Sequence, residues 1–215
     1  DFLLVPVPMR CAMQIPHRTA LATLFLPPFL SSSSQNSWDR QVFTTYKNVN
    51  TDQVMKDNDT ITENFMISNY QGQEAIDNDD GSAYYNTRHN VRVYAGNGMK
   101  NDFGGHDNHA HDNIYIYIGE GFGICNQLKN HVDFFVNNVV VQDNDGNYAN
   151  GACSGDGKTV VGNNTIFTPT GRVTECGTSL AQWQAQGNDP GTTNHSYAEL
   201  TDAMLLGYAR NVLGL

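Results

Sequence analysis

A short pattern of alternating apolar positions occurs five times along the chain, each time directly after an asparagine. The segments ENFMIS, HNVRVY, DNIYIY, NNVVVQ and NNTIFT place these asparagines at Asn64, Asn90, Asn113, Asn138 and Asn164. Successive asparagines are 26, 23, 25 and 26 residues apart. Alternation of this kind is the period-two signature of a half-buried strand. The pattern therefore predicts one strand in each repeat.

The alternation also suggests which side chains face the core. We assign to the core the mostly apolar positions one and three places after each asparagine, namely Phe65, Val91, Ile114, Val139 and Thr165, then Ile67, Val93, Ile116, Val141 and Phe167. The intervening positions are expected to form a more polar and aromatic outer face, made of Met66, Arg92, Tyr115, Val140 and Ile166, then Ser68, Tyr94, Tyr117, Gln142 and Thr168.

Single strands at this spacing predict an all-β fold, a parallel β-helix, or solenoid. The repeats are too short, and lack the pattern, for a crossover helix, so each is expected to form one coil stacked about 4.8 Å above the last. A buried asparagine at each corner can then hydrogen-bond to its equivalents above and below. A leucine-rich repeat would need a leucine consensus that is absent, and a calcium-binding nonapeptide roll would need a shorter period.

The C-terminal segment has a different period. Apolar side chains recur at helical spacing over residues 197–213, and Ser196 and Glu199 have the spacing of a capping box. We expect an amphipathic helix that packs on the β-helix and covers an apolar surface. The alternative, a helix lying on a membrane surface, has little support because Arg210 is its single basic residue.

This organisation divides the 215 residues into an N-terminal extension or cap (1–37), the parallel β-helix (38–190) and the C-terminal helix (191–215). Residues 19–30 are apolar and are either a remaining targeting segment or a packed terminal strand. Nothing reaches the length of apolar sequence that a membrane span needs.

Composition narrows the possible partners and the compartment. A net charge of −10 argues against nucleic acid and anionic membranes as partners, because both require basic patches, and favours a neutral ligand, a cation or a ligand held through a cation. Sequons at Asn58, Asn163 and Asn194 are expected glycan acceptors in a secreted or cell-surface protein. The cysteines Cys11, Cys125, Cys153 and Cys176 predict one or two disulfides with open pairing.

Ionisable residues concentrate on two consecutive coils. Counting back from Asn90 and from Asn113 aligns the segment DNDDG, residues 77–81, with KNDFG, residues 100–104. Lys100 is then expected to stack on Asp77, and Asn78, Asn101 and Asn126 are expected to form a second ladder. Close behind, His106, His109 and His111 lie in the segment HDNHAHD.

Three interpretations of this concentration remain open. In the first, Asp79 or Asp102 acts with His106 or Lys100 as acid and base on a sugar. In the second, Asp77, Asp79 and Asp102 supply the hard oxygen ligands that Ca²⁺ prefers. In the third, the acids and amides only cap polar turns.

Over residues 60–176 the chain resembles the right-handed parallel β-helix superfamily, the pectate-lyase-like group. Asp79–Asp80 followed by Gly105–His106 is similar to the arrangement of its pectin-hydrolysing members. Those members also carry an Arg-x-Lys, and here Thr174 stands two places after Arg172 where lysine is expected. Lyase members use a basic residue with Ca²⁺, and Lys100 beside Asp79 and Asp102 is similar to that. The resemblance implies carbohydrate chemistry.

The sequence therefore predicts a secreted polysaccharide lyase or glycoside hydrolase. The expected catalytic residues are Asp79, Lys100, Asp102 and His106, and the expected substrate-binding residues are Asp80, Arg88, Tyr94, His109, His111, Tyr115, Tyr117 and His131. Lys129, His131 and Asp133, one coil beyond the histidines, are expected to extend the groove. The alternative is a non-catalytic extracellular module that binds glycan or assembles through the ends of its β-helix.

Overall fold

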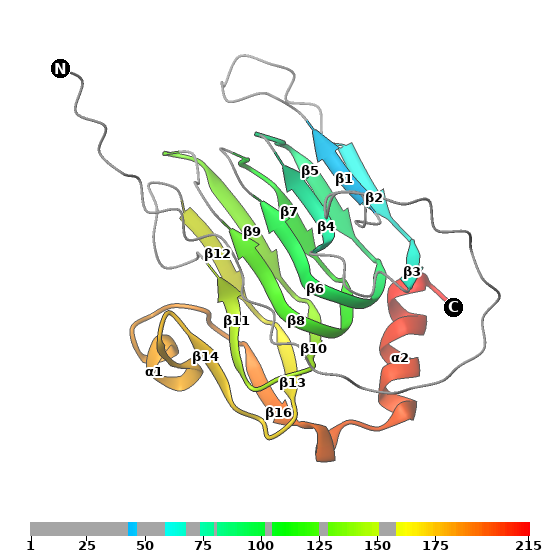
Figure 1. Ribbon diagram of the computed structural model, residues 1–215, viewed down its shortest axis with the longest axis vertical. Coiled ribbons are helices and arrows are strands. Elements are labelled where there is room, and N and C mark those ends of the chain that lie inside the picture. The colour runs from blue at the N-terminus through cyan, green and yellow to red at the C-terminus, as the bar shows by residue number, and fades with distance from the viewer. Residues whose placement is uncertain are drawn as a thin grey trace, which may run out of the picture. The chain divides into compact units, whose positions relative to one another are not determined.

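The computed structural model describes residues 43–46, 59–67, 74–79, 81–101, 105–124, 129–150 and 158–215. These residues form mainly parallel strands that stack in successive coils, followed by a C-terminal helix (Figure 1). The predicted class, a parallel β-solenoid with a C-terminal helix, is confirmed. The expected N-terminal extension or cap, residues 1–37, lies outside the described residues.

Two sheets make up the walls of the solenoid. The first follows the order β1 (Phe43–Tyr46), β4 (Glu74–Asp79), β6 (Val91–Asn101), β8 (Ile114–Ile124), β10 (Val139–Gln142), β13 (Thr165–Thr168) and β16 (Thr193–Ser196), and it includes β3 (Phe65–Ile67), β11 (Gly146–Asn150), β14 (Val173–Glu175) and β15 (Thr178–Ser179). The second contains β12 (Lys158–Gly162), β9 (Val132–Val136), β7 (His109–His111), β5 (Tyr85–Arg88) and β2 (Asp59–Thr62).

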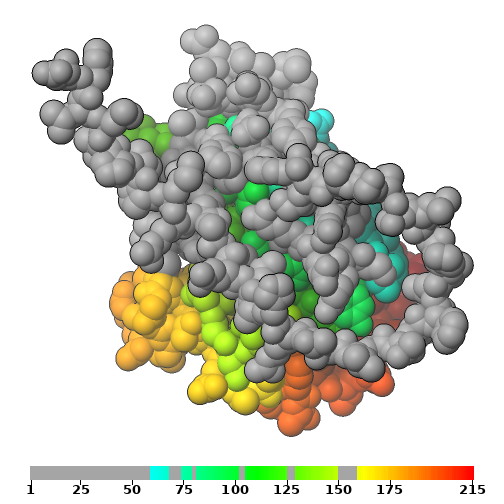
Figure 2. Space-filling model, in the orientation of Figure 1, coloured from blue at the N-terminus to red at the C-terminus, as the bar shows by residue number. Residues whose placement is uncertain are grey.

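The strand register confirms the predicted repeat. Phe65 pairs with Val91, Val91 with Ile114, Ile114 with Val139 and Val139 with Thr165, always in parallel. The solenoid therefore completes about four turns between Asn64 and Asn164. Because each coil stacks on the one before it, the surface colours pass from cyan to orange in chain order in Figure 2.

The asparagine ladder lies at the corner between the two sheets. Each backbone N–H donates to the side-chain oxygen of the next asparagine, over 3.1 Å from Asn64 to Asn90, 3.1 Å from Asn90 to Asn113, 3.0 Å from Asn113 to Asn138 and 2.8 Å from Asn138 to Asn164. The residue before each asparagine has a positive φ, between 52° and 59°, in Glu63, His89, Asp112, Asn137 and Asn163. The left-handed residue turns the chain, and the amide satisfies the backbone that the turn exposes.

The predicted inner and outer faces of the first sheet are reversed. Tyr115, Val140 and Ile166, expected outside, are fully buried in the main core, together with Phe122 and Phe135. The positions expected inside, among them Val91, Ile114, Ile116, Val141 and Phe167, form a second cluster on the outer face.

Helix α2 (Asp202–Leu213) explains this reversal, because it covers the outer face. The helix lies beside the first sheet (Figure 1). Its side chains Leu205, Tyr208, Val212 and Leu213 pack on the second cluster. Both faces of the sheet are therefore apolar, and alternation alone cannot tell them apart.

The predicted helix is divided into two pieces. The capping box of Ser196 and Glu199 is present, but it begins the 3₁₀ helix η2 (Tyr197–Glu199). Leu200 is extended, and α2 then begins with the Thr201 side chain accepting from the Met204 N–H.

The C-terminal end of the ladder is closed by a buried polar group beside helix α1 (Leu180–Ala185). The N–H of Asn164 donates to Thr192 Oγ1 over 3.0 Å, and Thr192 Oγ1 donates to Asp189. Asp189 also accepts from the Tyr148 hydroxyl over 2.7 Å. The nearby Glu175 is fully buried. Burial, and after it the charge of the Asp189 carboxylate, raises the pKa of Glu175 to about 9.

Candidate functional site

The candidate site lies at the corner where the chain enters the second sheet. His106 forms an isolated bridge with Ala83 of the preceding coil, and His131 occupies the equivalent place on the following coil, 25 residues later. A second corner ladder fixes this backbone. The Asn108 side chain accepts from the Tyr85 N–H over 3.0 Å, and Asp133 accepts from the Asn108 N–H over 3.0 Å.

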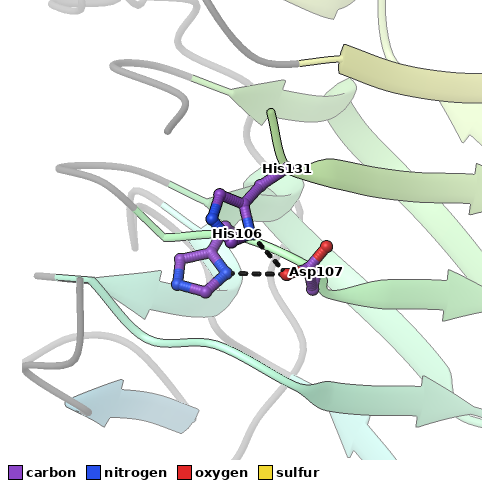
Figure 3. A group of neighbouring side chains, drawn as sticks. All are labelled: His106, Asp107 and His131. Carbon is purple, nitrogen blue, oxygen red and sulfur yellow. Dashed lines mark hydrogen bonds and ion pairs between the residues drawn. The ribbon is translucent and has the colours of Figure 1, made fainter. Parts of the chain in front are cut away.

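Asp107 joins the two histidines. Its Oδ2 lies 2.9 Å from Nδ1 of His106 and 2.6 Å from Nδ1 of His131 (Figure 3). Its Oδ1 accepts from the Val132 N–H over 3.2 Å. The two imidazole rings lie 4.0 Å apart between centroids, and Tyr84 meets His106 edge-on at 5.4 Å.

Asp107 is turned toward the histidines by a left-handed backbone, with φ of 55°. Partial burial opposes its ionisation, but hydrogen bonds from His131, His106 and the Val132 N–H outweigh that effect and lower the pKa of Asp107. An ionised carboxylate only accepts hydrogen bonds, so both histidines present a protonated Nδ1 to it.

Exposure differs across the three side chains. His106 is buried, at 1% exposure, whereas the side chains of His131 and Asp107 are 12% and 29% exposed. The site is therefore open on the side of His131 and Asp107. One nitrogen from each histidine and one oxygen of Asp107 lie within 4.8 Å of one another, so the group has the donor set of a transition-metal site.

Lys100 does not lie in this group. Its register partner is Asp77, as predicted, and its Nζ lies 3.2 Å from Asp77 Oδ2 and 3.9 Å from Glu74 Oε1. All three side chains are buried. The predicted second ladder is also present in its described part, because Asn78 donates to Asn101 over 2.7 Å.

Several predicted residues fall in parts of the chain that the structure does not describe. Asp80 and Asp102 lie outside the described residues, and of Asp79 only the backbone is described, in β4. Among the predicted calcium ligands, Asp77 is therefore the one with a described side chain, and it pairs with Lys100.

Three of the predicted substrate-binding residues lie along the second sheet. Arg88 and His111 pair in register, and His109 is exposed. The ring of His109 packs 4.2 Å from that of Phe134. His111 contacts Asp112 through Nδ1 at 2.6 Å and Asn86 through Nε2 at 2.8 Å.

The three predicted tyrosines are placed differently. Tyr94 and Tyr117 stack at another corner with centroids 5.7 Å apart, each 39% exposed and each with a positive φ. Tyr115 is buried in the core with Arg92, so it presents no surface to a ligand.

Of the sequons, Asn163 and Asn194 are exposed, and Asn58 lies outside the described residues.

Asp107 is the functional candidate that sequence reasoning missed. The coil period carries the signal that could have found it, because His106 plus 25 residues gives His131 and places Asp107 between them. The expected groove extension at His131 thus coincides with the site. Lys129 is exposed, whereas Asp133 is buried in the corner ladder.

Two further findings do not depend on the geometry of the site. Comparison with protein-family models, with curated proteins and with solved structures gives no match. Among the described residues, no helix has both the length and the apolar character to cross a membrane.

Proposed function

We propose that this protein is a secreted or cell-surface enzyme that cleaves a polysaccharide, by lyase or hydrolase chemistry, on a right-handed solenoid of the pectate-lyase-like kind. The observation that carries the proposal is the group His106, Asp107 and His131. It brings two imidazoles and one carboxylate together from consecutive coils, where a solenoid has no structural need of them. The disulfide at Cys176 supports an oxidising compartment.

The chemistry that this group supplies is proton transfer. His131 is partly exposed and exchanges a proton with the sugar, at a ring carbon in a lyase or at the glycosidic oxygen in a hydrolase. Asp107 holds Nδ1 of His131 over 2.6 Å and so sets its tautomer and its orientation. His106 fixes the carboxylate from the buried side over 2.9 Å.

The position of the group suits a long substrate. It lies at a corner of stacked coils, and the second sheet beside it carries Arg88, His109 and His111 on consecutive strands. A polymer lying across the coils would meet several of these side chains at about 4.8 Å intervals. This arrangement supports a polymer rather than a small molecule.

The test is turnover on a panel of polysaccharides that includes polygalacturonate, alginate, xylan and β-glucan. New reducing ends report cleavage, and ultraviolet absorbance of an unsaturated product separates a lyase from a hydrolase. We expect His131→Ala to lose at least about a hundredfold in rate, the contribution typical of a general acid or base. His195→Ala in β16 is the matched control, because Nδ1 of His195 also contacts a carboxylate, that of Glu199, and it should keep the activity of the parent. No turnover by the parent, or full activity in His131→Ala, would refute the proposal.

A second function is favoured by the stacked pair Tyr94 and Tyr117. A bulky side chain with positive φ is strained, and such strain gathers at functional sites. Their exposed rings offer a surface on which sugars stack, which fits a non-catalytic glycan-binding module. In that case oligosaccharides bind without turnover, and Tyr117→Ala weakens binding while His131→Ala does not.

A further inference from the structure

The three side chains of the candidate site also have the composition of a metal centre. We propose that His106, Asp107 and His131 bind one divalent transition-metal ion, with Zn²⁺ as the ion of choice. Within the described residues they form the one group of three histidine, cysteine or acidic side chains whose donor atoms converge in this way.

The donor types select the metal. Two imidazole nitrogens and one carboxylate oxygen suit Zn²⁺, which takes nitrogen, sulfur and oxygen ligands, and they do not suit Ca²⁺, which takes oxygen ligands alone. Three protein ligands would leave a fourth position open. Asp107 supplies a negative charge to the ion, and the chain as a whole, with a net charge of −10, attracts cations.

The distances require little movement. An ion about 2.0–2.1 Å from each ligand of a tetrahedron holds the ligands about 3.4 Å apart. Here Asp107 Oδ2 lies 2.9 Å and 2.6 Å from the two Nδ1 atoms. Each contact therefore has to widen by less than about 1 Å, and both nitrogens already face the same oxygen (Figure 3).

Binding changes the role of each histidine. The ion takes the place of the protons between Nδ1 and Asp107, and each imidazole binds in its neutral form with the proton on Nε2. His131 can then no longer accept a proton from a sugar. If the proposed function holds, Zn²⁺ is therefore also expected to inhibit cleavage.

The direct test is calorimetric titration of the full chain, free of affinity tag and stripped of metal, with zinc chloride. We expect one Zn²⁺ per chain. His131→Gln and Asp107→Asn should each weaken binding by at least about tenfold. His111→Gln is the matched control, because His111 also contacts an aspartate, Asp112, at 2.6 Å, and it should bind like the parent.

Folding of each variant is checked by circular dichroism, and NMR of the imidazole nitrogens in the parent identifies the bound histidines without any substitution. Absence of saturable Zn²⁺ binding by the parent overturns the proposal. Equal binding by the parent, His131→Gln and Asp107→Asn overturns it too, as do shifts confined to histidines other than His106 and His131. These measurements need no turnover, so an inactive parent that binds Zn²⁺ at this site refutes the proposed enzyme and leaves the metal site standing.

Discussion

The asparagine ladder allows a quantitative test at its centre, Asn113. Its side-chain oxygen accepts from the N–H of Asn90 over 3.1 Å and from the Asn90 amide over 3.0 Å. Its own amide donates to the carbonyls of Thr87 and His111 over 2.9 Å each, and to Asn138 over 3.1 Å. Asn113→Ala removes all of these contacts from a buried corner.

The expected loss follows from those contacts. A neutral hydrogen bond contributes about 1 kcal/mol, and a buried polar group left without its partner costs about 1–3 kcal/mol. We expect Asn113→Ala to lower the free energy of unfolding by about 3–5 kcal/mol. Asn64, at the end of the ladder, is half-buried, and its side chain bonds to Thr62 and to Asn90. We expect Asn64→Ala to cost about 1–2 kcal/mol.

Urea unfolding followed by circular dichroism measures both losses, provided that the dependence of free energy on urea is the same in each variant. Asn211→Ala, on the exposed face of α2, is the control and should lie within about 0.5 kcal/mol of the parent. If Asn113→Ala costs no more than Asn64→Ala, the ladder does not stabilise the coils in the way described.

Three further predictions concern the buried Glu175, helix α2 and the buried Arg92. Glu175 has a folded-state pKa of about 9 against an ordinary value of 4.5, so it favours the fold while protonated. Its contribution to stability is complete below about pH 4.5 and is lost as the pH rises to about 9. The melting temperature should therefore fall over this pH range, and Glu175→Gln should make the melting temperature less dependent on pH. Leu205 packs on the outer cluster, so Leu205→Asp should lower the free energy of unfolding by about 2 kcal/mol and raise the binding of a hydrophobic dye. Leu206 is exposed, and Leu206→Asp should change neither quantity. The Arg92 guanidinium is buried and makes no hydrogen bond in the described part of the chain. Arg92→Met should therefore raise the free energy of unfolding, measured by chemical denaturation, by about 1–3 kcal/mol. A loss of stability would contradict this prediction.

The coil is predictable from sequence because its repeat leaves a mark on every turn. A corner amide is needed once per coil, so the spacing of Asn64, Asn90 and Asn113 gives the number of residues in each coil directly. The same counting places Lys100 on Asp77 and Asn101 on Asn78, and the structure confirms both pairs. Both pairs follow from the strand register, which can be counted directly from the positions of the ladder asparagines.

The direction of the side chains is less predictable, for a physical reason. Period-two alternation separates two faces but does not say which of them is enclosed. Arg92 and Tyr115 are polar or amphipathic and were expected outside, yet both are buried. The deciding fact is that α2 covers the other face, and that depends on packing between segments far apart in the chain.

The site is predictable in part. His106 and His131 are evident as titratable groups, but their meeting depends on two coils of unequal length placing them at the same corner. Asp107 reaches both because its backbone is left-handed, with φ of 55°. Non-glycine residues enter that region rarely, and sequence gives only a weak indication of where they do so.

The asparagine ladder also has a direction, and this direction bears on how the chain can be made. Each asparagine N–H donates to the coil that follows it in the sequence, from Asn64 through to Asn164, whose N–H donates to Thr192. During synthesis from the N-terminus, the newest coil therefore always carries a corner N–H whose acceptor has not yet been made. A nascent solenoid is incomplete at its growing end after every turn, and the segment around Thr192 is the first that can end the series.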